Sequence, residues 1–154
     1  MKNKYAIICI CLITNTLGLF SQIPNPDFDS LLAKSLGADE RGMKKYVMVI
    51  LKTGTNNIKD KVLRDSLFKG HFKNIGLMAD LGKLVVAGPL EENDKYYRGI
   101  FILNVTTFED ATELLKNDPT ISKKIFDVEM FKWYGSAALQ ENGKVYKKIQ
   151  KYKN

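Results

Sequence analysis

The residue best suited to chemistry in this 154-residue chain is its single histidine, His71. It lies in the stretch 61–82, where apolar residues recur at helical spacing, and it projects near the middle of the apolar side. A neutral imidazole can take up and return a proton near neutral pH without a large change of environment. His71 is therefore a candidate acid–base residue facing a pocket. The structural alternative is a core histidine bonded to a backbone carbonyl.

Arg64 precedes His71 by about two helical turns, so the two side chains should share one face of the expected helix. Its guanidinium could hold an anionic group of a substrate near the imidazole. An arginine at the margin of a core can equally pack its stem on apolar surface and keep its charged head in water. Both interpretations of Arg64 stay open.

The first 21 residues have the pattern of a secretory signal peptide. Lys2 and Lys4 precede an uncharged run over 5–20, and Ser21 supplies the small residue before cleavage. The alternative is a membrane anchor, but polar residues interrupt the run and leave its apolar core short for a span. We therefore predict a periplasmic or secreted protein with no stable membrane anchoring after cleavage.

Both cysteines, Cys9 and Cys11, fall inside this segment, so the mature chain would have no thiol. That excludes a catalytic cysteine, a disulfide framework and a cysteine-based zinc site together. With one histidine, other metal sites also have few ligands. We expect neither a metal nor a cofactor.

The formal net charge of +7 comes from the two ends of the chain. Residues 140–154 are predicted to be a basic, solvated tail, and the body between the ends is close to neutral. A basic tail is weak evidence for a nucleic-acid partner. Arg98-Gly99 superficially matches an RNA-recognition motif, but Ile100 and Ile102 stand where stacking rings would be needed. No nucleic-acid partner is predicted.

The apolar runs predict one α+β domain. Residues 22–45, with two prolines, read as a linker that includes a short helix over 29–36. Strands are expected over 46–52, 84–87, 98–105 and 126–133, and helices over 61–82 and 107–117. The order βαββαβ predicts a ferredoxin-like fold, in which a four-stranded antiparallel sheet carries both helices on one face.

The strands over 46–52 and 98–105 are apolar at nearly every position instead of at alternate positions. An antiparallel sheet with one face in water should alternate, so both faces are expected to be covered. Two helices cover one face. We predict that a second copy covers the other, giving a homodimer through the sheet face with a dimeric α/β barrel.

Several short motifs occur in order along residues 46–139. They are His71, Gly76-Leu77-Met78, GKLVVAGP over 82–89, RGIFIL over 98–103, Ala111, Asp118-Pro119 and WYGSAAL over 133–139. On these residues the chain resembles the YCII-related (YciI-like) domain family, which belongs to the dimeric α/β-barrel superfamily. The last motif resembles the end of an exported subgroup.

The resemblance implies an active site of one histidine and one aspartate in a pocket beside the sheet, which by position are His71 and Asp118. It further implies a cofactor-free enzyme that eliminates or isomerises a small organic molecule. A carboxylate bonded to one ring nitrogen would fix the tautomer and stabilise the charged imidazole. Asp118 precedes a proline after a helix, so it can also cap backbone, and the two roles are compatible.

Five further residues join Arg64 as candidate substrate-binding residues: Gly88, Pro89, Tyr97, Arg98 and Trp133. The Gly88-Pro89 pair lets backbone approach closely, although a tight turn needs the same residues. The aromatic residues could line a cleft or fill the dimer core. The alternative function is a non-catalytic small-molecule-binding or accessory module of the same fold.

Overall fold

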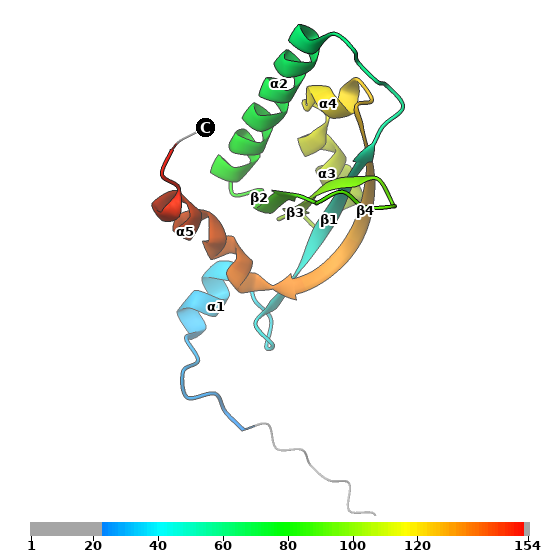
Figure 1. Ribbon diagram of the computed structural model, residues 1–154. Helices are drawn as coiled ribbons and strands as arrows, with labels where there is room; N and C mark the ends of the chain where they lie inside the picture. The colour runs from blue at the N-terminus through cyan, green and yellow to red at the C-terminus, as the bar shows by residue number, and fades with distance from the viewer. Residues whose placement is uncertain (1–22, 153–154) are drawn as a thin grey trace, which may run out of the picture.

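The structure, a computed structural model, describes residues 23–152 (Figure 1). The predicted signal peptide over 1–21 and both cysteines lie outside the described residues. Within residues 23–152, none of the helices has the length and apolar character needed to cross a bilayer.

Four antiparallel strands form one open sheet in an α+β chain, as predicted. They are β1 (Met43–Thr53), β2 (Leu84–Pro89), β3 (Tyr97–Leu103) and β4 (Phe126–Ser136). The strand order is β2-β3-β1-β4, so β1 and β3 are central, as the predicted element order βαββαβ implies for the first and third strands. β1 begins three residues earlier than expected, because Met43, Lys44 and Lys45 pair with the end of β4.

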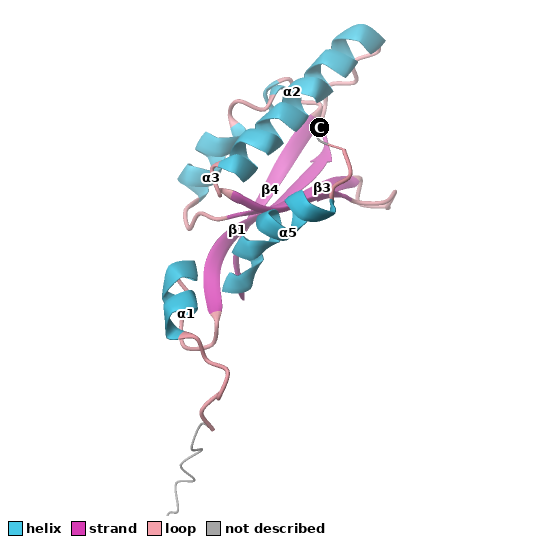
Figure 2. Cartoon of the chain, turned by 90° about the vertical axis from the view of Figure 1, so that its left-hand side faces the viewer, coloured by secondary structure: helices cyan, strands magenta, loops and turns pink. Residues whose placement is uncertain are grey.

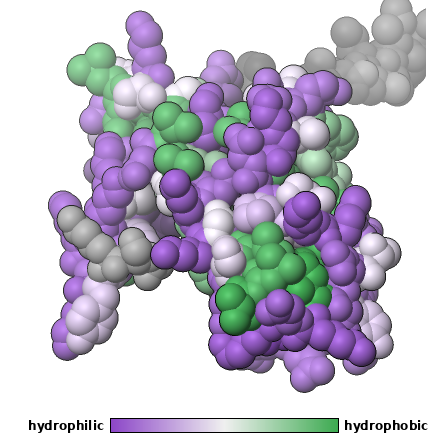
Figure 3. Space-filling view, turned by 90° about the horizontal axis from the view of Figure 1, so that it is seen from above, coloured by the Kyte–Doolittle hydropathy of each residue, from purple (hydrophilic) through white to green (hydrophobic). Residues whose placement is uncertain are grey.

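The long helix α2 (Lys61–Asp80) follows the sequence prediction closely. Its N-cap is Asp60, whose side chain accepts from the backbone of Val62 and Leu63. Gly82, at φ 65°, supplies the left-handed turn after it. Figure 3 looks down on the end of the molecule where α2 begins and shows an apolar patch there within a rim of hydrophilic side chains.

Three shorter helices complete the main body. α1 (Ser30–Leu36) lies in the expected linker, and α3 (Phe108–Leu115) is the expected second helix. α4 (Pro119–Ser122) is a single turn, and it lies outside the helices predicted from the sequence. α2 and α3 lie together on one side of the sheet (Figure 2).

The main core lies between the sheet and these two helices. It is built from Val47, Val49, Leu51, Met78, Leu84, Phe101, Leu103, Ala111 and Leu115. Alternate residues of β1 and β3 supply it, since successive side chains of a strand point to opposite faces. We call this side of the sheet the inner face.

The opposite side, the outer face, carries a smaller cluster. Tyr46 and Trp133 pack there with ring centroids 5.7 Å apart, and Leu139 covers them from the 3₁₀ helix η1 (Ala137–Glu141). The prediction that a second copy covers the outer face is therefore wrong at this end, where η1 of the same chain covers it. Farther along the strands, Met48 and Ile50 are only partly buried.

The C-terminal residues, predicted to be a solvated tail, include the helix α5 (Asn142–Ile149). Asn142 donates a 2.9 Å hydrogen bond to the carbonyl of Val85 in the edge strand β2. Lys147 lies 3.0 Å from the carboxylate of Asp80 at the end of α2. These two contacts hold α5 beside β2 and the end of α2, where it closes one side of the site described next.

Candidate functional site

His71 and Asp118 form a buried pair. Nδ1 of His71 lies 2.6 Å from Oδ2 of Asp118, and the two side chains are 7% and 0% exposed. The prediction that these two residues come within hydrogen-bond distance is thus met by the geometry. The bond is to a carboxylate and not to a backbone carbonyl, which sets this histidine apart from the structural alternative considered above.

Asp118 is held by backbone as well as by the imidazole. It is the N-cap of α4, where Oδ1 accepts 2.9 Å from the backbone N–H of Thr120 and 2.6 Å from the Thr120 hydroxyl. Oδ2 is therefore left for His71. The carboxylate caps the helix and orients the imidazole at once. Thr120, fully buried, was missed by the sequence analysis.

A close approach between α2 and α4 makes this pair possible. A Cβ on Gly70 would lie 2.5 Å from Cγ of Pro119, the residue that follows Asp118. Only a glycine lets α4 approach so near to the turn of α2 that carries His71. A glycine inside a helix lowers the stability of the fold, so its presence usually has a packing reason. Gly70 within the predicted helix was therefore the one sign in the sequence of a close contact at this turn.

The carboxylate is charged in this setting. Burial alone would raise the pKa of Asp118, but hydrogen bonds from His71 and Thr120 and the charge of His71 outweigh burial and hold its pKa below its ordinary value. A charged carboxylate accepts only, so Nδ1 of His71 is the donor. In the neutral imidazole the free lone pair then belongs to Nε2.

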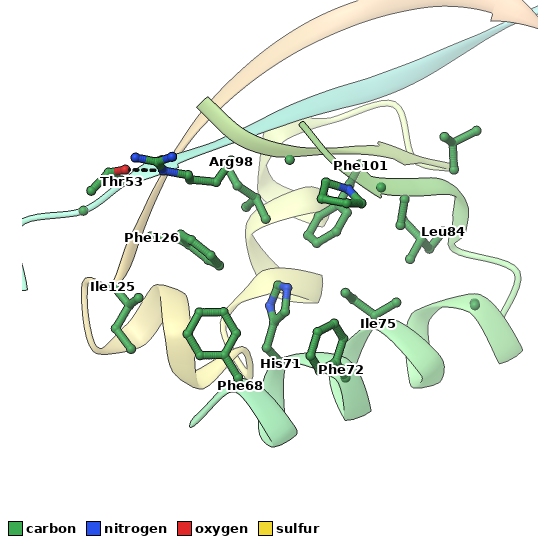
Figure 4. A pocket seen from close by; sticks show the side chains of 18 of the residues that line it. Thr53, Phe68, His71, Phe72, Ile75, Leu84, Arg98, Phe101, Ile125 and Phe126 are labelled. Carbon is green, nitrogen blue, oxygen red and sulfur yellow. Dashed lines mark hydrogen bonds between the residues drawn. The ribbon is translucent and has the colours of Figure 1, made fainter. Parts of the chain in front are cut away.

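The imidazole points into a space walled by aromatic rings (Figure 4). Four phenylalanine rings lie with centroids 5.5–6.2 Å from that of His71: Phe68, Phe72, Phe101 and Phe126. Among the described residues, Nε2 has no hydrogen-bond partner, and no fully buried side-chain N or O atom lacks one. The basic nitrogen is thus open to the cavity.

The cavity measures about 860 Å³ and lies between α2, strands β2 and β3, and α5. This size is within the range of about 300–1,000 Å³ typical of small-molecule sites. Its walls are mostly apolar, and the polar side chains that line it include Arg64, Arg98 and Asn142. No aspartate or glutamate is among its lining residues. The space suits a small, largely apolar molecule.

The cavity brings together four of the six predicted substrate-binding residues: Arg64, Gly88, Pro89 and Arg98. Tyr97 and Trp133 do not line it, which corrects the prediction. Trp133 pairs with Tyr46, so its ring points to the outer face. An irregularity in the pairing of β1 with β3 places Tyr97 opposite Lys52 on that same face, where its hydroxyl donates to Glu129.

Neither the aromatic wall around His71 nor the contribution of α5 is predicted from the sequence. Phe101 of β3 and Phe126 of β4 are far from His71 in the chain, and only the folded sheet brings their rings close to it. Tyr146 of α5 lines the cavity from a segment expected to be a free tail. No local pattern in the sequence could have joined these elements.

Within residues 23–152, His, Cys, Asp and Glu side chains form no group of three or more that could hold a metal ion. Neither a protein-family model nor a curated protein matches the chain. The resemblance to the YCII-related family therefore stays a prediction.

Proposed function

We propose that this protein is an exported, cofactor-free acid–base enzyme that eliminates or isomerises a small organic molecule. The observation that carries the proposal is the 2.6 Å bond between His71 and a charged, buried Asp118, with Nε2 open to an apolar cavity. The resemblance to YCII-related proteins and the signal-peptide pattern of residues 1–21 support the same assignment.

The chemistry follows from the imidazole and its partner. Nε2 of His71 takes a proton from a carbon next to a carbonyl group, and the electrons of the broken C–H bond stay on the substrate as an enolate. Asp118 stabilises the imidazolium that results. In an isomerisation, Nε2 returns the proton to a different carbon. In an elimination, the electron pair forms a double bond, the leaving group departs with its bonding electrons, and the proton passes to it or to water.

A purely structural role for this pair explains the geometry less well. The N-cap of α4 needs only the carboxylate, since Thr120 supplies its two donors to Oδ1. Burying a second titratable group against that carboxylate costs desolvation free energy that an apolar side chain would avoid. Placing the imidazole between a charged acceptor and an open cavity is what a general base requires. The same cavity would also serve a binding module without turnover.

Hydrogen exchange into small carbonyl compounds separates these two functions. In D₂O, the mature protein should accelerate deuterium incorporation into at least one member of a panel of ketones, lactones and unsaturated acids, followed by mass spectrometry. His71→Asn should lower that rate at least about 100-fold, because general-base catalysis contributes on that order. Lys69→Gln, an exposed change on the same helix, is the matched control and should leave the rate unchanged.

Exchange that survives in His71→Asn would contradict the proposal. Binding of panel members without any accelerated exchange by the wild-type protein would instead favour the binding module. Far-ultraviolet circular dichroism of both variants confirms that they are folded.

We also propose the ferredoxin-like fold and a homodimer joined through the outer face, as in a dimeric α/β barrel. The element order around the antiparallel sheet supports the fold. Met48, Ile50 and Ile100 support the dimer, because they are apolar and only partly buried on the outer face, and Phe131 beside them is 44% exposed. A contiguous apolar surface of this kind is typical of an interface.

Met48→Glu tests the dimer. The wild-type protein should sediment at twice the mass of one chain at micromolar concentration. The variant should sediment as a monomer, because the dimer would bury the new carboxylate at the interface beside the same carboxylate of the second copy. Lys45→Glu changes an exposed residue of the same strand that points to the inner side, and it should remain dimeric. A wild-type monomer would contradict the prediction.

A further inference from the structure

We infer that the cavity takes a small organic carboxylate, with the carboxylate group at Arg64 and Arg98 and the apolar body extending past His71 toward α5. This inference deepens the proposed function, since it names the substrate class of the same cavity. It concerns binding, however, and it holds whether or not His71 moves a proton.

The charges that line the cavity are the first argument. Two guanidinium groups line it, and no carboxylate does. Asp118, the acid that bonds His71, is fully buried and already accepts from His71 and Thr120. A ligand with a negative group would therefore meet only cations and neutral groups, while a cationic ligand would find no carboxylate among the lining residues.

Both arginines lack an acidic partner within residues 23–152. Asp65, next to Arg64 in the chain, pairs instead with Lys61. On β3, Nε of Arg98 donates 2.6 Å to the hydroxyl of Thr53, a neutral acceptor that positions the group without neutralising it. The terminal nitrogens of Arg98 keep their donors for a ligand, and a guanidinium offers two parallel donors that match a planar carboxylate.

The arrangement along α2 sets the direction of the ligand. Arg64 lies about 10 Å before His71 along the helix axis, at 1.5 Å per residue. Figure 4 shows Arg98 and Thr53 at one end of the cavity and Leu84 at the other, with His71 between them. Beyond His71 the lining includes the apolar Ile75 and Ala79 of α2. A carboxylate at the arginine end thus directs the carbon chain of the ligand along α2 toward the imidazole.

The loop at the arginine end favours a carboxylate over a phosphate. Phosphate sites usually rest on a series of free backbone N–H groups. Here the N–H of Gly54 donates to the carbonyl of Ile125, and that of Asn56 donates to the carbonyl of Lys124. These two N–H groups of the loop are engaged with the chain before β4 and are not available to an anion, which favours the side chains of Arg64 and Arg98 as its donors.

Matched pairs of ligands test the inference. Phenylacetate, 3-phenylpropanoate and 4-phenylbutanoate are titrated by calorimetry against their primary amides, with phenyl phosphate as a further arm. At least one carboxylate should bind about 10-fold or more tightly than its amide, as expected for a hydrogen bond to a charged group. Arg98→Gln should remove that preference, and Arg64→Gln, at an exposed position, should reduce it about threefold. Arg41→Gln, outside the cavity, is the control and should bind as the wild type does.

Three results would overturn the inference: amides that bind as tightly as their carboxylates, no binding by any member of the panel, or an unchanged preference in both arginine variants. Tighter binding of phenyl phosphate than of every carboxylate would overturn the choice of carboxylate. His71→Asn should keep the carboxylate preference. A wild-type protein that shows this preference but accelerates no exchange would contradict the proposed catalysis and leave this inference standing.

Discussion

Asp118→Asn should leave the protein folded and lower its proton-transfer activity by about 10³–10⁴-fold. The asparagine oxygen can still accept from Thr120 at the N-cap of α4, so the backbone bond is retained. Its amide group, however, donates to Nδ1 of His71 where the carboxylate accepted. The imidazole proton then moves to Nε2, which can no longer take a proton, and this wrong tautomer gives losses of that order in histidine–aspartate enzymes. The deuterium exchange rate measures the effect.

The matched control for Asp118→Asn is Asp60→Asn, the same change at the N-cap of α2, where no histidine contacts the carboxylate. Its exchange rate should equal that of the wild type. Unfolding by urea gives a second measure. The pKa of Asp118 is lowered in the folded state, so its contribution to stability is complete above its ordinary value near 3.8 and is lost as the pH falls through the folded value. The wild type should therefore lose its stability advantage over Asp118→Asn in acid. Full activity in Asp118→Asn would contradict the assigned role of the carboxylate.

The central strands could be predicted because burial leaves a local pattern. β1 and β3 are apolar on both faces, and that continuity predicted that both faces of the sheet are covered. The start of β1 could not be predicted in the same way. Lys44 and Lys45 look like solvated linker, and only their pairing with Gly135 and Tyr134 of β4 makes them part of a strand.

His71 could be predicted as a site residue from its chemical type, but the residues that surround it could not. Asp118 follows from the resemblance and not from any spacing, because it lies on a different element from His71. Tyr97 and Trp133 are predicted to line the cavity as aromatic residues at the ends of strands, yet strand alternation and one pairing irregularity turn both to the outer face. The lysines of α5 made this segment look like a solvated tail in the sequence. Its packing depends on the hydrogen bonds of Asn142 to Val85 in β2 and of Lys147 to Asp80 in α2.

The contact between α2 and α4 gives the second large effect, in Gly70→Ala. A methyl group there would lie 2.5 Å from Cγ and 3.3 Å from Cδ of Pro119, and a proline ring cannot rotate away. α4 must therefore shift, at a cost of about 1–3 kcal/mol for an overfilled contact. Asp118 precedes that proline, so the same shift disturbs its bond to His71. We expect a lower free energy of unfolding and an exchange rate reduced about 10-fold, since small misplacements of catalytic groups have effects up to about 100-fold.

Gly76→Ala, on the same helix, is the control that isolates this contact. A Cβ at Gly76 meets nothing within 4 Å, so the change only replaces a poor helix former by a good one and should stabilise the protein by about 0.5–1 kcal/mol. That gain is common to both variants. The difference between their unfolding free energies, measured in urea, is therefore the cost of the methyl group against Pro119, about 1–3 kcal/mol. If the two variants prove equally stable and equally active, α4 does not hold Asp118 against His71 as tightly as this geometry requires.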